Sequence, residues 1–396
     1  MTSSPRHLTL PAFVAFAAFG AFWGVWGASV PRVQDQAGIT GGELGFALLF
    51  IGAGALPAML LTGRAIDRWG LTVAAAAVGA LGVTSAGVAL VAVNLPALCA
   101  GLAVVGAMSG AADVAMNAVA GRAETTAARP VITRAHGVFS SLVVLGSLST
   151  GLASGLPLAV PFTAVALLSV LAAVALLKTL PAGTANAVRA EPDPPGEWKL
   201  TPFLLLGALG TLAFASENAH QSWSAVFAHD ELHSGVGLSA IAPAVFAGTV
   251  AATRFSIGGV KAAHARTVLL SGAVTAAAGT ALIAAAPTLL IAAFGLAAAA
   301  AGTAVLFPTL LGIVSRNVEE SHRGRATSIV TTVSYIGFIL GPVYVGLWAA
   351  NVGLRGAMVA VAALGVALFA LIPVLLRLSG FSEPAATRRA ADNQPV

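Results

Sequence analysis

The chain has 396 residues, of which 58% are hydrophobic and only 9% are charged, and its mean hydropathy is +0.91. Soluble globular proteins are about 45–50% apolar and about 25% charged, so this composition excludes an ordinary soluble domain, a disordered chain and a secreted disulfide scaffold. The net charge of +5 is spread singly over short segments, so it predicts no nucleic-acid partner. We therefore expect an all-α integral membrane protein.

Charge-free stretches mark the expected membrane spans, because about 30 Å of hydrocarbon is crossed at about 1.5 Å per residue. Turn residues such as Asn94-Leu95-Pro96 divide the longer stretches into two. The pattern predicts twelve transmembrane helices, over residues 9–31, 42–63, 71–93, 97–120, 134–156, 160–180, 201–226, 237–258, 267–286, 288–315, 326–349 and 354–377.

A polar segment rich in proline, residues 181–200, lies between the sixth and the seventh predicted helix. It predicts a cytoplasmic linker between an N-terminal six-helix half, residues 1–180, and a C-terminal six-helix half, residues 201–378. Residues 379–396 form the expected cytoplasmic tail. Two six-helix halves are a known plan of secondary transporters, which expose a central site to each side of the membrane in turn.

Lysine and arginine are distributed very unevenly over the predicted loops. Alternate loops hold nearly all of them, whereas the intervening loops hold only Arg32 and Arg355. Because basic residues accumulate on the cytoplasmic side, we expect a multi-pass protein of the cell inner membrane with both termini in the cytoplasm.

The segment after the second predicted helix reads Gly63-Arg64-Ala65-Ile66-Asp67-Arg68-Trp69-Gly70. It resembles the G-x-x-x-D-R-x-G signature of the major facilitator superfamily. Sequences in helices 4, 5, 7 and 11 are similar to a bacterial branch labelled sugar- or fucose-permease-like. The resemblance implies the major facilitator fold and a conformational switch loop formed by Gly63, Asp67, Arg68 and Gly70. Leu71 and Thr72 depart from the basic residues usual after the signature, and helix 5 lacks the Gly-Pro motif of drug antiporters.

Asp113 is the sharpest candidate for chemistry. A charged carboxylate near the middle of a spanning helix costs about 2.5–3.5 kcal/mol, so such a residue usually faces a bundle interior or a watery cavity. Asn117 lies one turn away on the same face. We expect Asp113 to be a proton-coupling residue with Asn117 in the substrate cavity; a structural hydrogen bond is the alternative. His136 in helix 5 is a candidate proton relay, or else a packed or capping histidine.

Helix 7 carries a polar stripe of Glu217, His220 and Gln221. We expect Glu217 to take part in proton coupling, and His220 and Gln221 to line the substrate cavity; a helix end in the wet interface is the alternative. Arg254 in helix 8 is expected to form an inner gate with a carboxylate, or else to snorkel toward the interface.

Two aromatic residues in helix 1, Trp23 and Trp26, are three residues apart and can face one side. Flat aromatic surfaces suit sugar rings and organic ligands, so both are candidates for the substrate cavity. The alternative is a pair of interfacial or lipid-facing aromatics.

These observations predict a proton-coupled secondary active transporter of a small organic solute that works by alternating access. Efflux of a metabolite or drug and uptake of a sugar-like compound both remain open, and a transport-inactive membrane sensor or a membrane-embedded enzyme is the alternative. An enzyme is not expected, because no convergent nucleophile and base are visible. We expect no cofactor and no metal, although residues 229–233 read His-Asp-Glu-Leu-His. The expected partners are the solute, protons and the lipid bilayer, and the expected state is a monomer.

Overall fold

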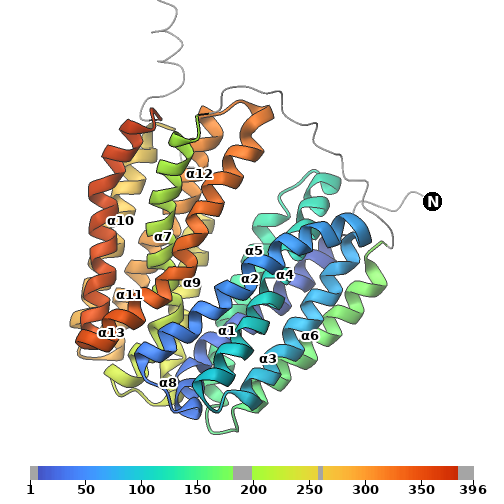
Figure 1. Ribbon diagram of the computed structural model, residues 1–396, viewed down its shortest axis with the longest axis vertical. Coiled ribbons are helices and arrows are strands. Elements are labelled where there is room, and N and C mark those ends of the chain that lie inside the picture. Colours follow the sequence, from blue (N-terminus) through green and yellow to red (C-terminus); the bar gives the residue numbers. More distant parts are fainter. Residues whose placement is uncertain (1–7, 182–198, 257–261, 382–396) are drawn as a thin grey trace, which may run out of the picture. The chain divides into compact units, whose positions relative to one another are not determined.

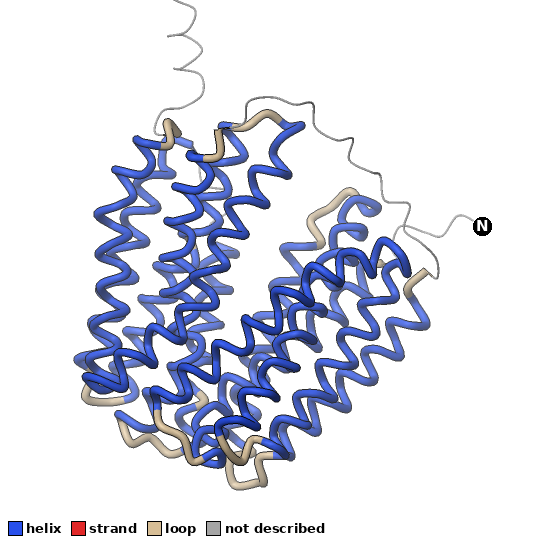
Figure 2. The backbone as a smooth tube through the Cα atoms, in the orientation of Figure 1, coloured by secondary structure: helices blue, strands red, loops and turns tan. Residues whose placement is uncertain are grey.

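The computed structural model describes residues 8–181, 199–256 and 262–381, with the side chains of residues 262, 320 and 321 left aside. Most of the predicted linker and of the predicted C-terminal tail lies outside the described residues. The described part of the chain is helical with short connections and contains no strand (Figure 2). The expectation of an all-α protein is confirmed.

Nine described segments are long and apolar enough to cross a membrane. Two of them are double: Gly41–Val91 holds two helices, and His322–Leu378 holds two helices that meet at Gly353, where φ is 74° and ψ is 173°. The helix α7 (Thr201–Val226) is not among the nine, because polar residues lower its hydropathy. With α7 included, the segments account for the twelve predicted crossings of a multi-pass membrane protein.

The chain divides into two compact units. The first unit contains the described residues up to 181 together with residues 222–251. Its helices are α1 (Thr9–Ala37), α2 (Gly41–Trp69), η1 (Gly70–Thr72), α3 (Val73–Val91), α4 (Leu95–Ala127), α5 (Ile132–Leu152), α6 (Ala159–Thr179), the π-helical η2 (Phe227–Glu231), α8 (Val236–Ser239) and most of α9 (Ile241–Ser256).

Glycine lets the helices of the first unit approach closely, as small residues do in membrane bundles. Helix α1 packs on α5, α2 on α4 and α3 on α6 (Figure 1). A side chain at Gly20 would collide with the backbone of Phe139, and one at Gly106 would collide with the backbone of Ile51. The glycines of α1 and α4 therefore serve helix packing.

The second unit contains most of α7, the end of α9, and the helices that follow them: η3 (Ala262–His264), α10 (Ala265–Ala285), α11 (Leu289–Ala304), α12 (Leu306–Asn317) and α13 (Glu320–Leu378). Leucine, alanine and valine side chains of α7, α10, α12 and α13 share one buried core. A side chain at Gly337 of α13 would collide with the Thr211 carbonyl of α7, so these two helices also meet backbone to backbone.

The expected span over residues 288–315 is found as one apolar stretch, Leu289–Asn317, but the structure interrupts its helix at Val305, between α11 and α12. The cause lies in the sequence. In a continuous helix the Ala304 carbonyl would accept a hydrogen bond from the residue four positions later, but that residue is Pro308, which has no N–H. Proline at this position also crowds the same carbonyl, so the regular helix ends there.

The predicted switch loop is also corrected. Gly63, Asp67 and Arg68 lie inside α2, which continues to Trp69, and the turn begins only at Gly70. Gly70 has φ of 77° and ψ of −166°, a conformation essentially restricted to glycine, and it ends the helix. The four residues therefore form the last turns of a helix and its cap, which we call the α2 switch end (Gly63, Asp67, Arg68, Gly70).

Candidate functional site

The polar centre of the first unit is the pair Asp113 and Asn117 on α4. They are four residues apart, so a helix brings their side chains together. The Nδ2 atom of Asn117 donates to the Asp113 carboxylate Oδ1 at 3.1 Å and to the Asp113 carbonyl at 2.9 Å. Oδ2 of Asp113 has no hydrogen-bond partner among the described residues. The carboxylate is thus held by one amide and keeps one oxygen open to a proton or a ligand.

His136, the predicted proton relay, contacts an aromatic ring of α1. The His136 ring lies edge-on against Phe16 of α1, with 4.9 Å between ring centroids. His136 itself is exposed on α5. The relay from His136 to Asp113 remains a prediction.

The two tryptophans of α1 occupy different environments. Trp26 is 4% exposed and belongs to the packed interior of the first unit. Trp23 is half-buried and lies edge-to-face with Phe22, at 5.2 Å between centroids. Of the pair, Trp23 is the better placed to meet a ligand.

In the second unit, Arg254 near the end of α9 forms an ion pair with Glu217 of α7. Nη2 of Arg254 lies 3.0 Å from Oε1 and 3.3 Å from Oε2 of Glu217. The Glu217 side chain is 16% exposed and that of Arg254 is 42% exposed. This ion pair joins α9 to α7.

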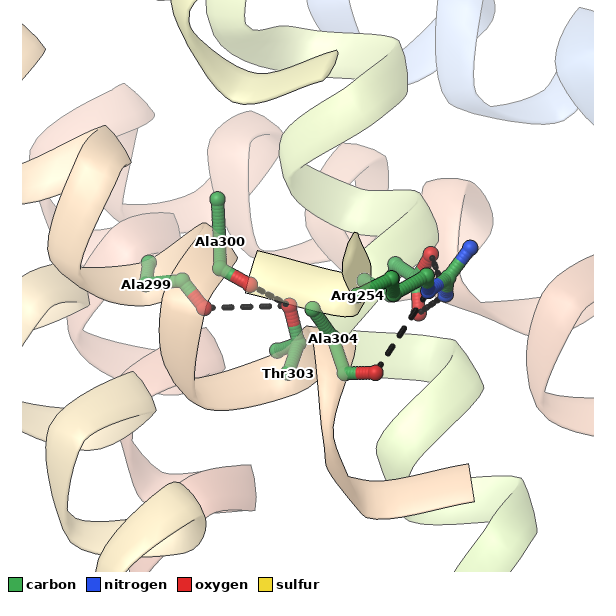
Figure 3. Close-up of polar contacts among 6 residues, drawn as sticks. Arg254, Ala299, Ala300, Thr303 and Ala304 are labelled. Atoms are coloured by element: carbon green, nitrogen blue, oxygen red, sulfur yellow. Dashed lines mark hydrogen bonds and ion pairs between the residues drawn. The ribbon is translucent and has the colours of Figure 1, made fainter. Parts of the chain in front are cut away.

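Arg254 also compensates for the break in the α11–α12 helix. The Ala304 carbonyl, which cannot bind to Pro308, accepts a hydrogen bond from Nε of Arg254 at 3.4 Å (Figure 3). The guanidinium thus connects α9, α7 and the point where α11 gives way to α12. Its remaining nitrogen, Nη1, has no partner within the described ranges, and Figure 3 shows a guanidinium nitrogen extending away from the drawn contacts.

The other two residues of the predicted polar stripe, His220 and Gln221, lie in different environments. His220 is 1% exposed, with Nδ1 2.6 Å from the Ser216 carbonyl and Nε2 2.9 Å from the Thr280 hydroxyl of α10. This histidine joins α7 to α10 inside the unit, which does not fit the expected position in a substrate cavity. Gln221 is half-buried and remains a candidate.

A group of half-buried aromatic rings, which the sequence analysis missed, lies in the second unit. Phe214 of α7 packs on Phe307 of α12 at 4.3 Å, and on Tyr335 and Phe338 of α13 at 5.8 and 6.5 Å between centroids. Tyr335 and Phe338 lie 5.8 Å apart. We call these four residues the aromatic cluster. The available signal was Phe214, one turn before Glu217 on the same face.

Near the end of α1, a small charged group lies at the surface of the first unit. His229 of η2 is 3.8 Å from the Asp35 carboxylate of α1. Loss of water contacts raises the pKa of the neighbouring Asp230 carboxyl, and His229 partly offsets this effect. In the described part of the chain, no group of three metal-ligating side chains comes together, here or elsewhere.

Comparison with known proteins identifies a family. The family model described as Major Facilitator Superfamily matches residues 12–262 and 260–396. An uncharacterised MFS-type transporter of Yersinia pestis is 29% identical over 333 residues, which is 80% of this chain and 82% of the relative. An uncharacterised transporter of Sinorhizobium fredii is 26% identical over 87% of this chain and 92% of its own length.

Solved structures show the same fold at low sequence identity. The nucleoside transporter NupG covers 94% of this chain and 99% of its own, with a TM-score of 0.75 at 16% identity. A D-xylose-proton symporter covers 92% of this chain and 96% of its own, with a TM-score of 0.74 at 14% identity.

Proposed function

Because this chain belongs to the Major Facilitator Superfamily and is a transporter rather than an enzyme, we propose that it moves a small organic solute by alternating access, driven by protons. The family does not define the solute, so the proposal depends on side chains. Proton coupling needs a titratable group inside a spanning helix, and this chain has few.

The observation that carries the proposal is Asp113 in the middle of α4, held by Asn117 and with one oxygen unpartnered among the described residues. A carboxylate in a membrane interior is costly when charged, so its protonation removes an obstacle to closing apolar surfaces around it. Proton binding at Asp113 would thereby favour one conformational state. We propose Asp113 as the essential proton site, with His136 as its relay.

The second unit supplies further candidate residues. We propose that Glu217 takes part in proton coupling and that its ion pair with Arg254 is a gate toward the cytoplasmic side. Trp23 and Asn117 of the first unit, and separately Gln221 of the second unit, are candidates for contact with the solute. The α2 switch end is proposed to stabilise one conformational state through its charged residues.

The basic residues of the predicted loops support an inner-membrane location with both termini in the cytoplasm. The nucleoside and xylose transporters named above share the fold, so a solute of similar size is compatible with it. Import of a sugar-like compound and export of a metabolite are both consistent with the proposed site.

The proposal is tested in proteoliposomes with an imposed pH gradient, against a panel of labelled sugars, nucleosides and organic acids. Asp113→Asn resembles the protonated side chain in size and lacks the charge. We expect this variant to exchange solute across the membrane but to lose accumulation driven by the gradient. The matched control is Asp35→Asn, which changes a carboxylate that is 67% exposed at the end of α1 and should accumulate solute normally.

Undiminished accumulation by Asp113→Asn would show that Asp113 is not the proton site. Absence of any gradient-dependent flux in the unmodified protein would instead favour the transport-inactive sensor.

A further inference from the structure

Two segments of the chain connect the Arg254–Glu217 ion pair to the aromatic cluster. On α7, Phe214 lies three residues before Glu217, and residues at this spacing share a helix face. Around the α11–α12 break, Phe307 lies three residues after Ala304, whose carbonyl binds Arg254. Both connections lie within the second unit, so they bring the guanidinium and the aromatic rings to one region.

The guanidinium has unused capacity for an anion. Nε binds the Ala304 carbonyl and Nη2 binds Glu217, which leaves the N–H groups of Nη1 without a partner in the described part of the chain. Arginine presents its donors in a planar fork that matches a carboxylate. An arginine side chain that is 42% exposed in a membrane helix faces water or a ligand, because exposure to hydrocarbon is costly.

The aromatic cluster adds an apolar surface of defined shape. All four rings are half-buried, so part of each remains accessible. Aromatic rings prefer edge-to-face or offset contacts with another ring. A ligand that carries an anionic carboxylate and a flat aromatic ring would match the guanidinium at one end and the rings at the other.

We propose that Arg254 and the aromatic cluster form a binding site for aromatic carboxylates, with Glu217 as an internal competitor for the arginine. The inference rests on the proposed transport of a small organic solute and names the chemical class of that solute. Without ligand, Glu217 occupies Nη2; a bound carboxylate takes over the guanidinium edge and releases Glu217.

Charge balance links this exchange to protons. Without a bound ligand the Arg254–Glu217 pair is neutral, whereas Glu217 and a ligand carboxylate beside one guanidinium carry a net negative charge. Uptake of one proton from water by the displaced Glu217 restores neutrality, so solute and proton would bind together. This assigns Glu217 a role in coupling that follows from its contact with Arg254.

The experiment measures equilibrium binding to the purified full-length chain in lipid nanodiscs, which requires no transport. The probes are benzoate, phenylacetate and naphthoate. Benzamide lacks the negative charge, and cyclohexanecarboxylate lacks the aromatic ring. We expect the aromatic carboxylates to bind more tightly than either control compound.

Variants separate binding from structural support. Arg254→Gln should lower benzoate affinity by about 30-fold or more, as loss of a charged partner does. Phe307→Leu should lower it by about 3- to 10-fold. Glu217→Gln should instead raise it severalfold, because the competitor no longer holds the arginine. Arg266→Gln and Phe255→Leu, at an exposed arginine and an exposed phenylalanine, should leave it unchanged.

The opposite signs expected for Arg254→Gln and Glu217→Gln distinguish a ligand site from a structural ion pair, whose two partners should weaken binding alike. If Arg254→Gln does not fold because Glu217 is left unpaired, the double variant removes both charges and should show the same loss. No preference for aromatic carboxylates over the control compounds, or reduced affinity in Glu217→Gln, would overturn the inference. Failure of the flux experiment on Asp113 would leave these binding results unaffected.

Discussion

The side-chain amide nitrogen of Asn117 donates hydrogen bonds to two oxygen atoms of Asp113, the carboxylate Oδ1 and the backbone carbonyl. A hydrogen bond to a charged group contributes about 1.5–3 kcal/mol, so the amide holds the Asp113 carboxylate in place. The two residues should therefore act as one functional unit.

The first prediction follows from this relationship. We expect Asn117→Ala to lower gradient-driven flux about tenfold, in line with the loss of one such hydrogen bond. In the Asp113→Asn background the same change should have little further effect, because the charged partner is already absent. Flux in proteoliposomes of the two single variants and the double variant measures this coupling. Independent, additive losses would show that Asn117 acts elsewhere.

The second prediction concerns packing of α2 on α4. A methyl group at Gly106 would collide with the Ile51 backbone, so Gly106→Ala should destabilise the protein by about 1–3 kcal/mol. At Gly87 in α3 nothing lies within 4 Å of the added atom, and Gly87→Ala should stabilise the helix by about 0.5–1 kcal/mol. Thermal unfolding in detergent compares the variants. Equal midpoints would argue against the close helix contact.

The third prediction concerns the α2 switch end. Gly70→Ala should cost about 1–3 kcal/mol, because alanine is strained at a φ of 77° and a ψ of −166°. Gly63 lies within the helix with nothing within 4 Å of an added Cβ, so Gly63→Ala should be tolerated. We expect only Gly70→Ala to lower both the unfolding midpoint and the rate of solute exchange. Normal behaviour of Gly70→Ala would remove the conformational argument for this glycine.

The fourth prediction concerns pH. The pKa of Asp230 is raised by lost water contacts, so the charged form is less favourable in the folded protein than in the unfolded chain. The carboxylate therefore costs no stability below the ordinary pKa of an aspartate, and its cost appears as pH rises through the raised value. Asp230→Asn should increase the unfolding midpoint at neutral pH and leave it unchanged below the ordinary pKa of an aspartate. A uniform change across pH would contradict this assignment.

Several features of the fold could be predicted from the sequence because they depend on local rules. Helix positions follow from the length of apolar stretches, and the neighbourhood of Asp113 and Asn117 follows from helical periodicity. The break at Val305 was also predictable, since Pro308 was visible inside the expected helix. The end of α2 differs from the expected loop, because its charged residues are compatible with a helix that extends beyond the apolar span.

The pairing of Glu217 with Arg254 could not be predicted in the same way. The two residues lie on different helices, and periodicity determines which residues share a face of one helix but not which faces meet. For the same reason the aromatic cluster could not be predicted, because its rings come from three helices, α7, α12 and α13. His220 shows the converse: its polarity suggested a ligand site, whereas a hydroxyl on α10 satisfies it.

Pro308 makes the bend of the α11–α12 helix depend on a side chain from another helix. A regular helix satisfies its own carbonyls, but here the Ala304 carbonyl obtains its donor from Arg254. Drawing Arg254 away would leave that carbonyl without its side-chain donor, and the bend would have to adjust. The curvature of this helix and the occupancy of the arginine are thus energetically linked, so an anion at Arg254 can influence backbone shape without touching the backbone itself.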